Sequence, residues 1–158
     1  PLRIVETVVD INSKRKSRMA DKIIETCGGV DGKTIAILGV TFKPNTDDMR
    51  DSPSLDIVAA LQDAGATIRA FDPEGMEEAK AMMADITWCA DAYETMREAD
   101  AVCIITEWNE FRALDLERAK NLLKAPVMID LRNIYDPEDM SSAGFTYVSV
   151  GRARVDGS

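Results

Sequence analysis

The sequence predicts an α/β protein: a Rossmann-like, doubly wound sheet of six parallel strands, preceded by a long N-terminal helix. Short apolar runs rich in β-branched residues recur along the chain, as is typical of buried parallel strands. Segments with apolar residues at helical spacing separate these runs. Strands that alternate with helices build a parallel sheet through right-handed crossovers, so we expect the strand order 3-2-1-4-5-6.

The expected strands are short and mostly apolar, at residues 34–40, 67–71, 86–88, 101–106, 127–131 and 146–150. Helices are expected at residues 53–63, 74–83, 90–97 and 114–123, with a short one after the turn at residues 136–137. Ser52 followed by Pro53 is typical of a helix start, because a hydroxyl can cap the helix and proline fits its first position.

Residues 1–28 predict one long helix, with an apolar stripe formed by Val5, Val8, Val9, Met19, Ile23 and Ile24. Gly28 and Gly29 are expected to end it. The stripe has no obvious partner in a compact six-stranded domain, so we expect it to pack on a second chain or to lie exposed. The first residues carry no N-cap, which suggests a chain cut from a longer protein. We therefore expect a helix at 1–28, a ligand-binding domain at 29–151 and a frayed tail at 152–158.

The composition argues against several classes of function. The 158 residues carry a net charge of −9, so we expect no nucleic-acid partner. No apolar run reaches membrane-spanning length and no signal peptide is visible, so we expect no membrane partner. The three cysteines show no metal-binding spacing, which predicts a cytoplasmic protein without a metal site. The absence of histidine removes the commonest acid–base residue.

The segment from Gly39 to Pro53 joins the first strand of the expected sheet to the helix that follows. Open α/β sheets bind ligands at such loops, and a helix N-terminus favours anions. Lys43 and Arg50 lie on this loop, so we expect an anion site, for phosphate. A Rossmann dinucleotide site needs further glycines here, but the next glycine is Gly65. This domain is therefore not expected to be the main binder of a nicotinamide cofactor.

Three strings in the sequence carry a family resemblance. Residues 42–53 read F-K-P-N-T-D-D-M-R-D-S-P, residues 106–111 read T-E-W-N-E-F, and residues 130–133 read D-L-R-N with Tyr135 after them. They resemble the C-terminal, UDP-binding domain of the UDP-glucose/GDP-mannose dehydrogenase family, over residues 1 to about 151. The T-E-W-x-E-F string is similar to the UDP-glucose branch. The GDP-mannose and UDP-N-acetylmannosamine dehydrogenases share this architecture and remain alternatives.

Four residues are candidates for ligand contacts. Lys43 offers a compact charge for phosphate or for a base carbonyl. Phe42 can line a uracil pocket or fold back as a plug onto the core. The resemblance implies that Arg132 binds substrate, against the alternative of a salt bridge to Asp130. It also implies that Arg50 reaches the NAD of the partner domain, against the alternative of a local ion-pair network with neighbouring aspartates.

Other polar and aromatic residues at the expected ligand edge have structural interpretations. Asp72 could hold a ribose, but Pro73 directly after it favours the role of a helix N-cap. Trp108 and Phe111 are expected to pack on the core rather than to stack on a ligand. Asp47 and Asp48 are assigned to the architecture of the loop, since free carboxylates would repel phosphate.

The resemblance implies an NAD-dependent oxidoreductase that converts UDP-glucose to UDP-glucuronate, and a homo-oligomer in the intact enzyme. The glycine-rich string that carries the family's catalytic cysteine is missing here, and so is the N-terminal domain that binds most of the NAD. We therefore expect this chain alone to be inactive. Other classes are a non-catalytic dimerisation module and a receiver-like domain, although the latter needs an aspartate where Trp88 and Cys89 stand.

Overall fold

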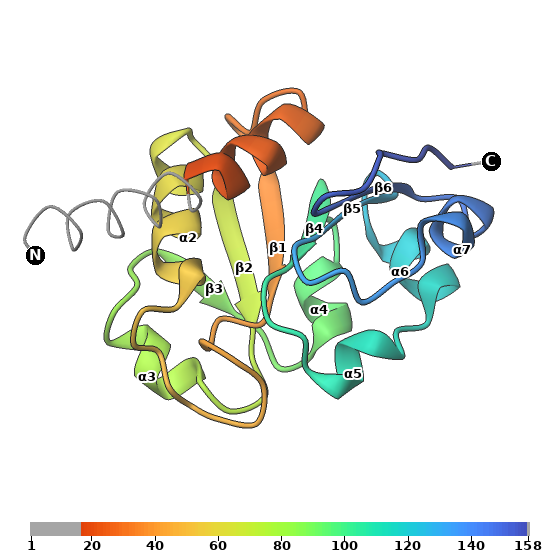
Figure 1. The fold of residues 1–158 in the computed structure, drawn as a ribbon. Helices are drawn as coiled ribbons and strands as arrows, with labels where there is room; N and C mark the ends of the chain where they lie inside the picture. The colour runs from red at the N-terminus through yellow and green to blue at the C-terminus, as the bar shows by residue number, and fades with distance from the viewer. Residues whose placement is uncertain (1–16, 158) are drawn as a thin grey trace, which may run out of the picture.

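The computed structural model describes residues 17–157 (Figure 1). Residues 17–26 are helical. The strands that follow are β1 (Thr34–Leu38), β2 (Thr67–Phe71), β3 (Ile86–Trp88), β4 (Ala101–Ile104), β5 (Val127–Asp130) and β6 (Thr146–Ser149). The helices are α2 (Pro53–Asp63), α3 (Met76–Lys80), α4 (Ala92–Met96), α5 (Asn109–Arg112), α6 (Leu116–Leu122) and α7 (Pro137–Ser142).

The six strands form one sheet in the order β3-β2-β1-β4-β5-β6, and every neighbouring pair is parallel. The predicted fold class and strand order are therefore confirmed. The two central strands β1 and β4 are almost wholly buried, because helices cover both faces of the sheet. The order in which the strands are added to the sheet reverses between β1 and β4, and the carboxyl ends of this pair border the crevice where such sheets bind ligands.

Each face of the sheet has its own apolar core. On one face, α2 and the helix at residues 17–26 pack on alternate strand residues such as Ile35, Ile37 and Cys103. On the other face, α4 to α7 pack on the intervening residues, among them Ala36, Leu38 and Val102. This alternation follows from the two-residue period of a strand, and it buries both faces of the sheet.

The expectation for the apolar stripe of the first helix is wrong where the structure describes it. Ile23 is fully buried and Ala20 almost so, and Met19 and Ile24 pack against the same core as β1. The stripe packs on the chain's own sheet because α2 leaves part of that face uncovered (Figure 1). The helix ends at glycine as predicted, with Gly29 N–H donating to Ile24 O at 2.9 Å. Residues 1–16 lie outside the described part of the chain.

The predicted helix at residues 114–123 is confirmed as α6, which begins at Leu116 because Asp115 caps it by accepting from Arg118 N–H. The short helix α5 before it was not predicted. One further expectation is wrong. The tail at residues 152–157 is not frayed. Val155 forms an antiparallel bridge with Tyr147 of β6, with backbone hydrogen bonds of 2.9 and 3.1 Å. The tail therefore covers the edge of the sheet, where unpaired backbone groups would otherwise face solvent.

No helix within residues 17–157 is long and apolar enough to cross a membrane.

Candidate functional site

The loop between β1 and α2, residues 39–52, is closed at its base. Val40 O accepts hydrogen bonds from the hydroxyls of Ser52 and Ser54, both at 2.6 Å. Further along, Phe42 N–H donates to Asp48 O at 2.9 Å. The three residues that close the base are fully buried, whereas most side chains of the tip are exposed. The loop therefore presents its tip residues from a fixed base.

Gly39 starts this loop at a point where a side chain cannot fit. Its φ is +86°, and a Cβ there would lie 2.6 Å from Thr106 Cβ and 2.9 Å from the backbone N and O of Thr106. The glycine thus lets the end of β1 approach the end of β4 closely. In this fold the glycine serves that approach, and it does not belong to a dinucleotide fingerprint.

Asp72, directly after β2, anchors three loops at once. Its Oδ2 accepts from the N–H groups of Val40 and Thr41 at 2.8 and 3.1 Å, from the Thr41 hydroxyl and from Trp108 Nε1. Its Oδ1 accepts from the N–H groups of Glu74 and Gly75. The carboxylate is fully buried, so Asp72 has no surface for a ribose. The expected N-cap role is also incomplete, because α3 begins at Met76 with Gly75 as its cap.

The N-terminus of α2 is not an open anion site. Ser52 is the N-cap as predicted and accepts from Ser54 N–H, but both serines are fully buried. Asp56 adds a negative charge in the first turn. A ligand anion would have to displace this packing. The helix end therefore offers no exposed site for an anion, and the exposed tip of the loop is left as the ligand-facing part.

Phe42 and Lys43 both lie exposed on the tip. Phe42 is 47% exposed, so the alternative of a plug folded onto the core is wrong. The Lys43 ammonium makes no hydrogen bond or ion pair with any residue in the range 17–157. An exposed aromatic ring next to an uncommitted cation has the chemistry to contact a base and an anionic group.

Arg50 is committed to its own loop. Its Nε and Nη2 donate to the two carboxylate oxygens of Asp48, each at 3.1 Å. These hydrogen bonds hold the pKa of the Asp48 carboxyl below its usual value. The arginine side chain is 88% exposed, and beside it is a hollow of about 440 Å³ that Asp47, Glu78 and Met82 also line. The structure thus has the local ion pair that the sequence offered as the alternative for Arg50.

The loop after β5, residues 131–136, is held by a second buried aspartate. Asp130 accepts from the N–H groups of Arg132, Ile134 and Tyr135 and from the Tyr147 hydroxyl. Asn133 exchanges two hydrogen bonds with Val150, at 2.9 and 2.8 Å. The D-L-R-N string therefore specifies a rigid turn that projects Arg132 from the carboxyl end of β5.

The partner of Arg132 is not the one that the sequence suggested. Asp130 accepts a hydrogen bond from the backbone N–H of Arg132 and not from its side chain, so the alternative of a salt bridge between the two side chains is wrong. The guanidinium Nε instead donates to Glu107, which lies on the loop after β4. Sequence analysis missed Glu107, and its only signal was the place of the T-E-W-N-E-F string after a neighbouring strand.

The remaining candidates are structural. Trp108 and Phe111 are buried, as predicted, and Phe111 packs edge-on against Phe71 with ring centroids 6.1 Å apart. The three cysteines are unpaired, and burial raises the pKa of each thiol, that of Cys103 by most. None of them is an activated thiolate. Residues 17–157 hold no cluster of three or more possible metal ligands.

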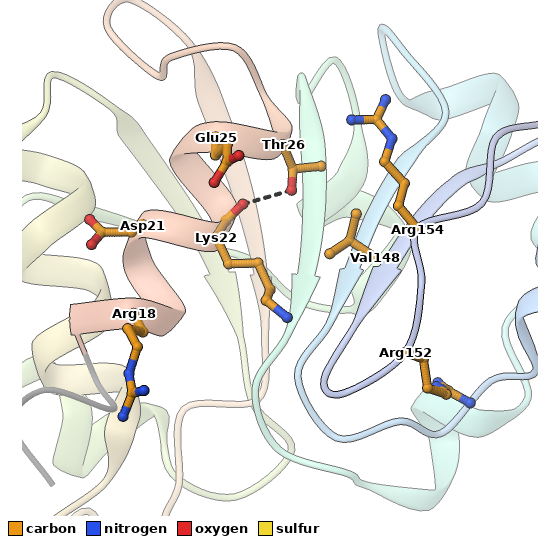
Figure 2. A pocket seen from close by; sticks show the side chains of 8 residues that line it. All are labelled: Arg18, Asp21, Lys22, Glu25, Thr26, Val148, Arg152 and Arg154. Atoms are coloured by element: carbon orange, nitrogen blue, oxygen red, sulfur yellow. Dashed lines mark hydrogen bonds between the residues drawn. The ribbon is translucent and has the colours of Figure 1, made fainter. Parts of the chain in front are cut away.

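A second hollow of about 440 Å³ lies between the helix at residues 17–26 and the C-terminal tail (Figure 2). Four cationic side chains line it, those of Arg18, Lys22, Arg152 and Arg154, together with Asp21 and Glu25. Lys22 donates to Ser149 O, Arg152 to Ser149 Oγ, and Arg154 to Asp156. Figure 2 shows the four cationic groups spread around the hollow rather than directed at one point. We do not assign a ligand to it.

Comparison with known sequences gives a family match. The UDP binding domain of the UDP-glucose/GDP-mannose dehydrogenase family matches residues 36–137. A UDP-glucose 6-dehydrogenase of Rhizobium meliloti (strain 1021) is 54% identical over 153 residues, which are 96% of this chain and 35% of that protein. The UDP-glucose 6-dehydrogenase TuaD of Bacillus subtilis (strain 168) is 41% identical over 158 residues, 99% of this chain and 34% of that protein. The chain thus spans about a third of these relatives.

Solved structures give the same fold. A UDP-glucose dehydrogenase from Pyrobaculum islandicum matches with a TM-score of 0.70 and 29% identity, over 81% of this chain and 28% of that chain. A UDP-D-ManNAc dehydrogenase from Pyrococcus horikoshii matches with a TM-score of 0.74 and 25% identity, over 90% of this chain and 32% of that chain.

Proposed function

This chain belongs to the UDP-glucose/GDP-mannose dehydrogenase family and contains its UDP-binding domain, and we propose that it binds the nucleotide of UDP-glucose in an NAD-dependent UDP-glucose 6-dehydrogenase. The proposed parent reaction oxidises UDP-glucose to UDP-glucuronate. One observation carries the proposal: the exposed Phe42 and Lys43 follow β1 and Arg132 follows β5, so all three stand at the carboxyl edge of one sheet. The relatives named UDP-glucose 6-dehydrogenase support the choice of sugar nucleotide.

Each of the three residues has a chemical role in this proposal. Lys43 supplies a point charge and Arg132 a planar fork of donors, and the two flank a diphosphate from loops on either side of β4. Phe42 packs its exposed ring on the uracil. Because the bases of both loops are fixed by buried aspartates, the free protein needs little reordering before it binds.

The proposed NAD site lies mainly on a domain that this chain does not include. The loop from β1 to α2 contains one glycine, Gly39, and Thr106 packs directly against it. The residues of this loop therefore do not fit the glycine-rich turn that binds a dinucleotide. We propose that Arg50 contacts the NAD held by that other domain. To do so, its guanidinium would have to release the Asp48 carboxylate and donate to the cofactor instead. We also propose a homo-oligomer for the intact enzyme and a cytoplasmic location, which suits three unpaired cysteines.

The chain alone is proposed to be inactive in oxidation. The family's chemistry needs a nucleophilic cysteine, and burial makes all three thiols here weaker acids rather than stronger ones. This part of the proposal is tested by following NADH absorbance with the purified chain, UDP-glucose and NAD⁺. A rate above that of the buffer blank refutes it.

Calorimetric titrations of the chain with UDP and, for comparison, with GDP test the proposed binding role. UDP should bind and GDP should bind more weakly. Lys43→Ala and Arg132→Ala should each weaken the binding of UDP by about ten- to a hundredfold, since a charge-assisted hydrogen bond contributes about 1.5 to 3 kcal/mol. Lys124→Ala is the matched control, because that exposed lysine lies before β5, at the opposite edge of the sheet. If the parent chain and the three variants bind UDP equally well, the proposed site is wrong. If the parent chain binds GDP more tightly than UDP, the proposed preference for uracil is wrong.

A further inference from the structure

We propose that Glu107 is a positioning residue for nucleotide binding, which holds the Arg132 guanidinium by its Nε so that its two terminal nitrogens stay available to the diphosphate. The inference rests on the proposed function, because it assumes that Arg132 contacts the nucleotide. It concerns a residue of the T-E-W-N-E-F string, which the sequence connected only with the choice of sugar nucleotide.

The contact itself uses one corner of the guanidinium. Arg132 Nε donates to Glu107 Oε2, while Nη1 and Nη2 make no hydrogen bond with any residue in the range 17–157. Arginine binds phosphate best through two parallel N–H donors in a fork. A carboxylate that takes only Nε fixes the plane of the group and leaves a second edge of the fork, made by the terminal nitrogens, for the ligand.

Both residues of the pair start from rigid backbone. The neighbours of Glu107 on either side are anchored: the Thr106 hydroxyl donates to Thr41 O at 2.6 Å, and Trp108 Nε1 donates to Asp72. Arg132 N–H donates to Asp130 Oδ1 at 3.0 Å. The Glu107 side chain is 19% exposed and that of Arg132 is 40% exposed. The glutamate thus lies beneath a guanidinium that remains accessible to a ligand.

Two opposing effects of Glu107 predict opposite results. A carboxylate near a diphosphate repels it, so removing Glu107 would strengthen binding if repulsion were its main effect. If positioning is its main effect, removing Glu107 lets a long side chain regain its rotamer freedom and weakens binding. Replacement by glutamine separates the two effects, because it removes the charge and keeps an oxygen acceptor for Nε.

The test is UDP titration of the chain carrying Glu107→Ala or Glu107→Gln. Glu107→Ala should weaken the binding of UDP by about three- to tenfold. Glu107→Gln should recover at least half of that loss in affinity on a logarithmic scale. Glu110→Ala is the matched control, because it removes an exposed carboxylate of the same string, whereas the carboxylate that pairs with Arg132 is that of Glu107. Tighter or unchanged binding by Glu107→Ala overturns the proposal, and so does a glutamine variant as weak as the alanine variant.

A double-mutant cycle separates positioning from damage to the loop. In the Arg132→Ala background, Glu107→Ala should cause no further loss of UDP affinity. An equal loss in both backgrounds would mean that Glu107 acts on the loop and not through Arg132, and would overturn the inference while UDP binding by the parent chain still upholds the proposed function. No UDP binding by the parent chain refutes the proposed function, and the inference with it.

Discussion

Replacing Asp72 by alanine should destabilise the domain far more than removal of an ordinary aspartate. The carboxylate is fully buried and accepts six hydrogen bonds, from the end of β1, the Trp108 indole and the turn before α3. Loss of the acceptor leaves several buried donors unpaired, and each costs about 1 to 3 kcal/mol. Some donors will find water as the loops relax, so we expect a net loss of about 3 to 5 kcal/mol.

The measurement is urea denaturation of the Asp72→Ala and Asp72→Asn variants, with Asp115→Ala as control. Asp115 also accepts a backbone hydrogen bond, from Arg118, but it is an exposed N-cap, so its loss should cost about 1 kcal/mol. Asparagine keeps one acceptor oxygen and should give an intermediate loss. An Asp72→Ala variant within about 1 kcal/mol of the Asp115→Ala control would refute the anchoring role of the carboxylate.

Two further predictions concern glycine and tyrosine. Gly39→Ala should lower the free energy of unfolding in urea by at least about 1 kcal/mol more than Gly151→Ala does. Both glycines have a positive φ, but only a Cβ at Gly39 would meet Thr106. Equal losses in the two variants would contradict the close approach of β1 and β4. Burial raises the pKa of Tyr135 to about 12 in the folded chain. Ionisation is therefore easier after unfolding, so the contribution of Tyr135 to stability should be constant below pH 10 and fall between about pH 10 and 12. Tyr135→Phe should make that fall shallower, and an unchanged pH profile would argue against the shift.

The strand pattern was predictable because it is local. The bounds of β2 and β3 agree with the expected ranges, and the other strands are only one or two residues shorter than expected. Short runs of β-branched residues between helical segments give this information directly. The strand order followed from the alternation of strands and helices, without any knowledge of contacts.

The contacts between loops were not predictable in the same way. Arg132 has an acidic neighbour in sequence, Asp130, yet its side chain pairs with Glu107, which is 25 residues away. The pair exists because β4 and β5 are adjacent and end at the same edge. Likewise, nothing in the sequence around Val155 indicates that it bridges to Tyr147. Such pairings depend on which strand ends become neighbours after folding.

The closed base of the loop between β1 and α2 has a consequence for how binding specificity can change. The hydrogen bonds to Val40 O and Asp72 all lie at the root, whereas Phe42, Lys43 and Arg50 extend from the tip. Substitutions of the exposed tip side chains should therefore leave the root bonds and the sheet intact. These exposed positions can vary between relatives without a new fold, whereas Met49 in the same segment is buried in the core and has to be kept.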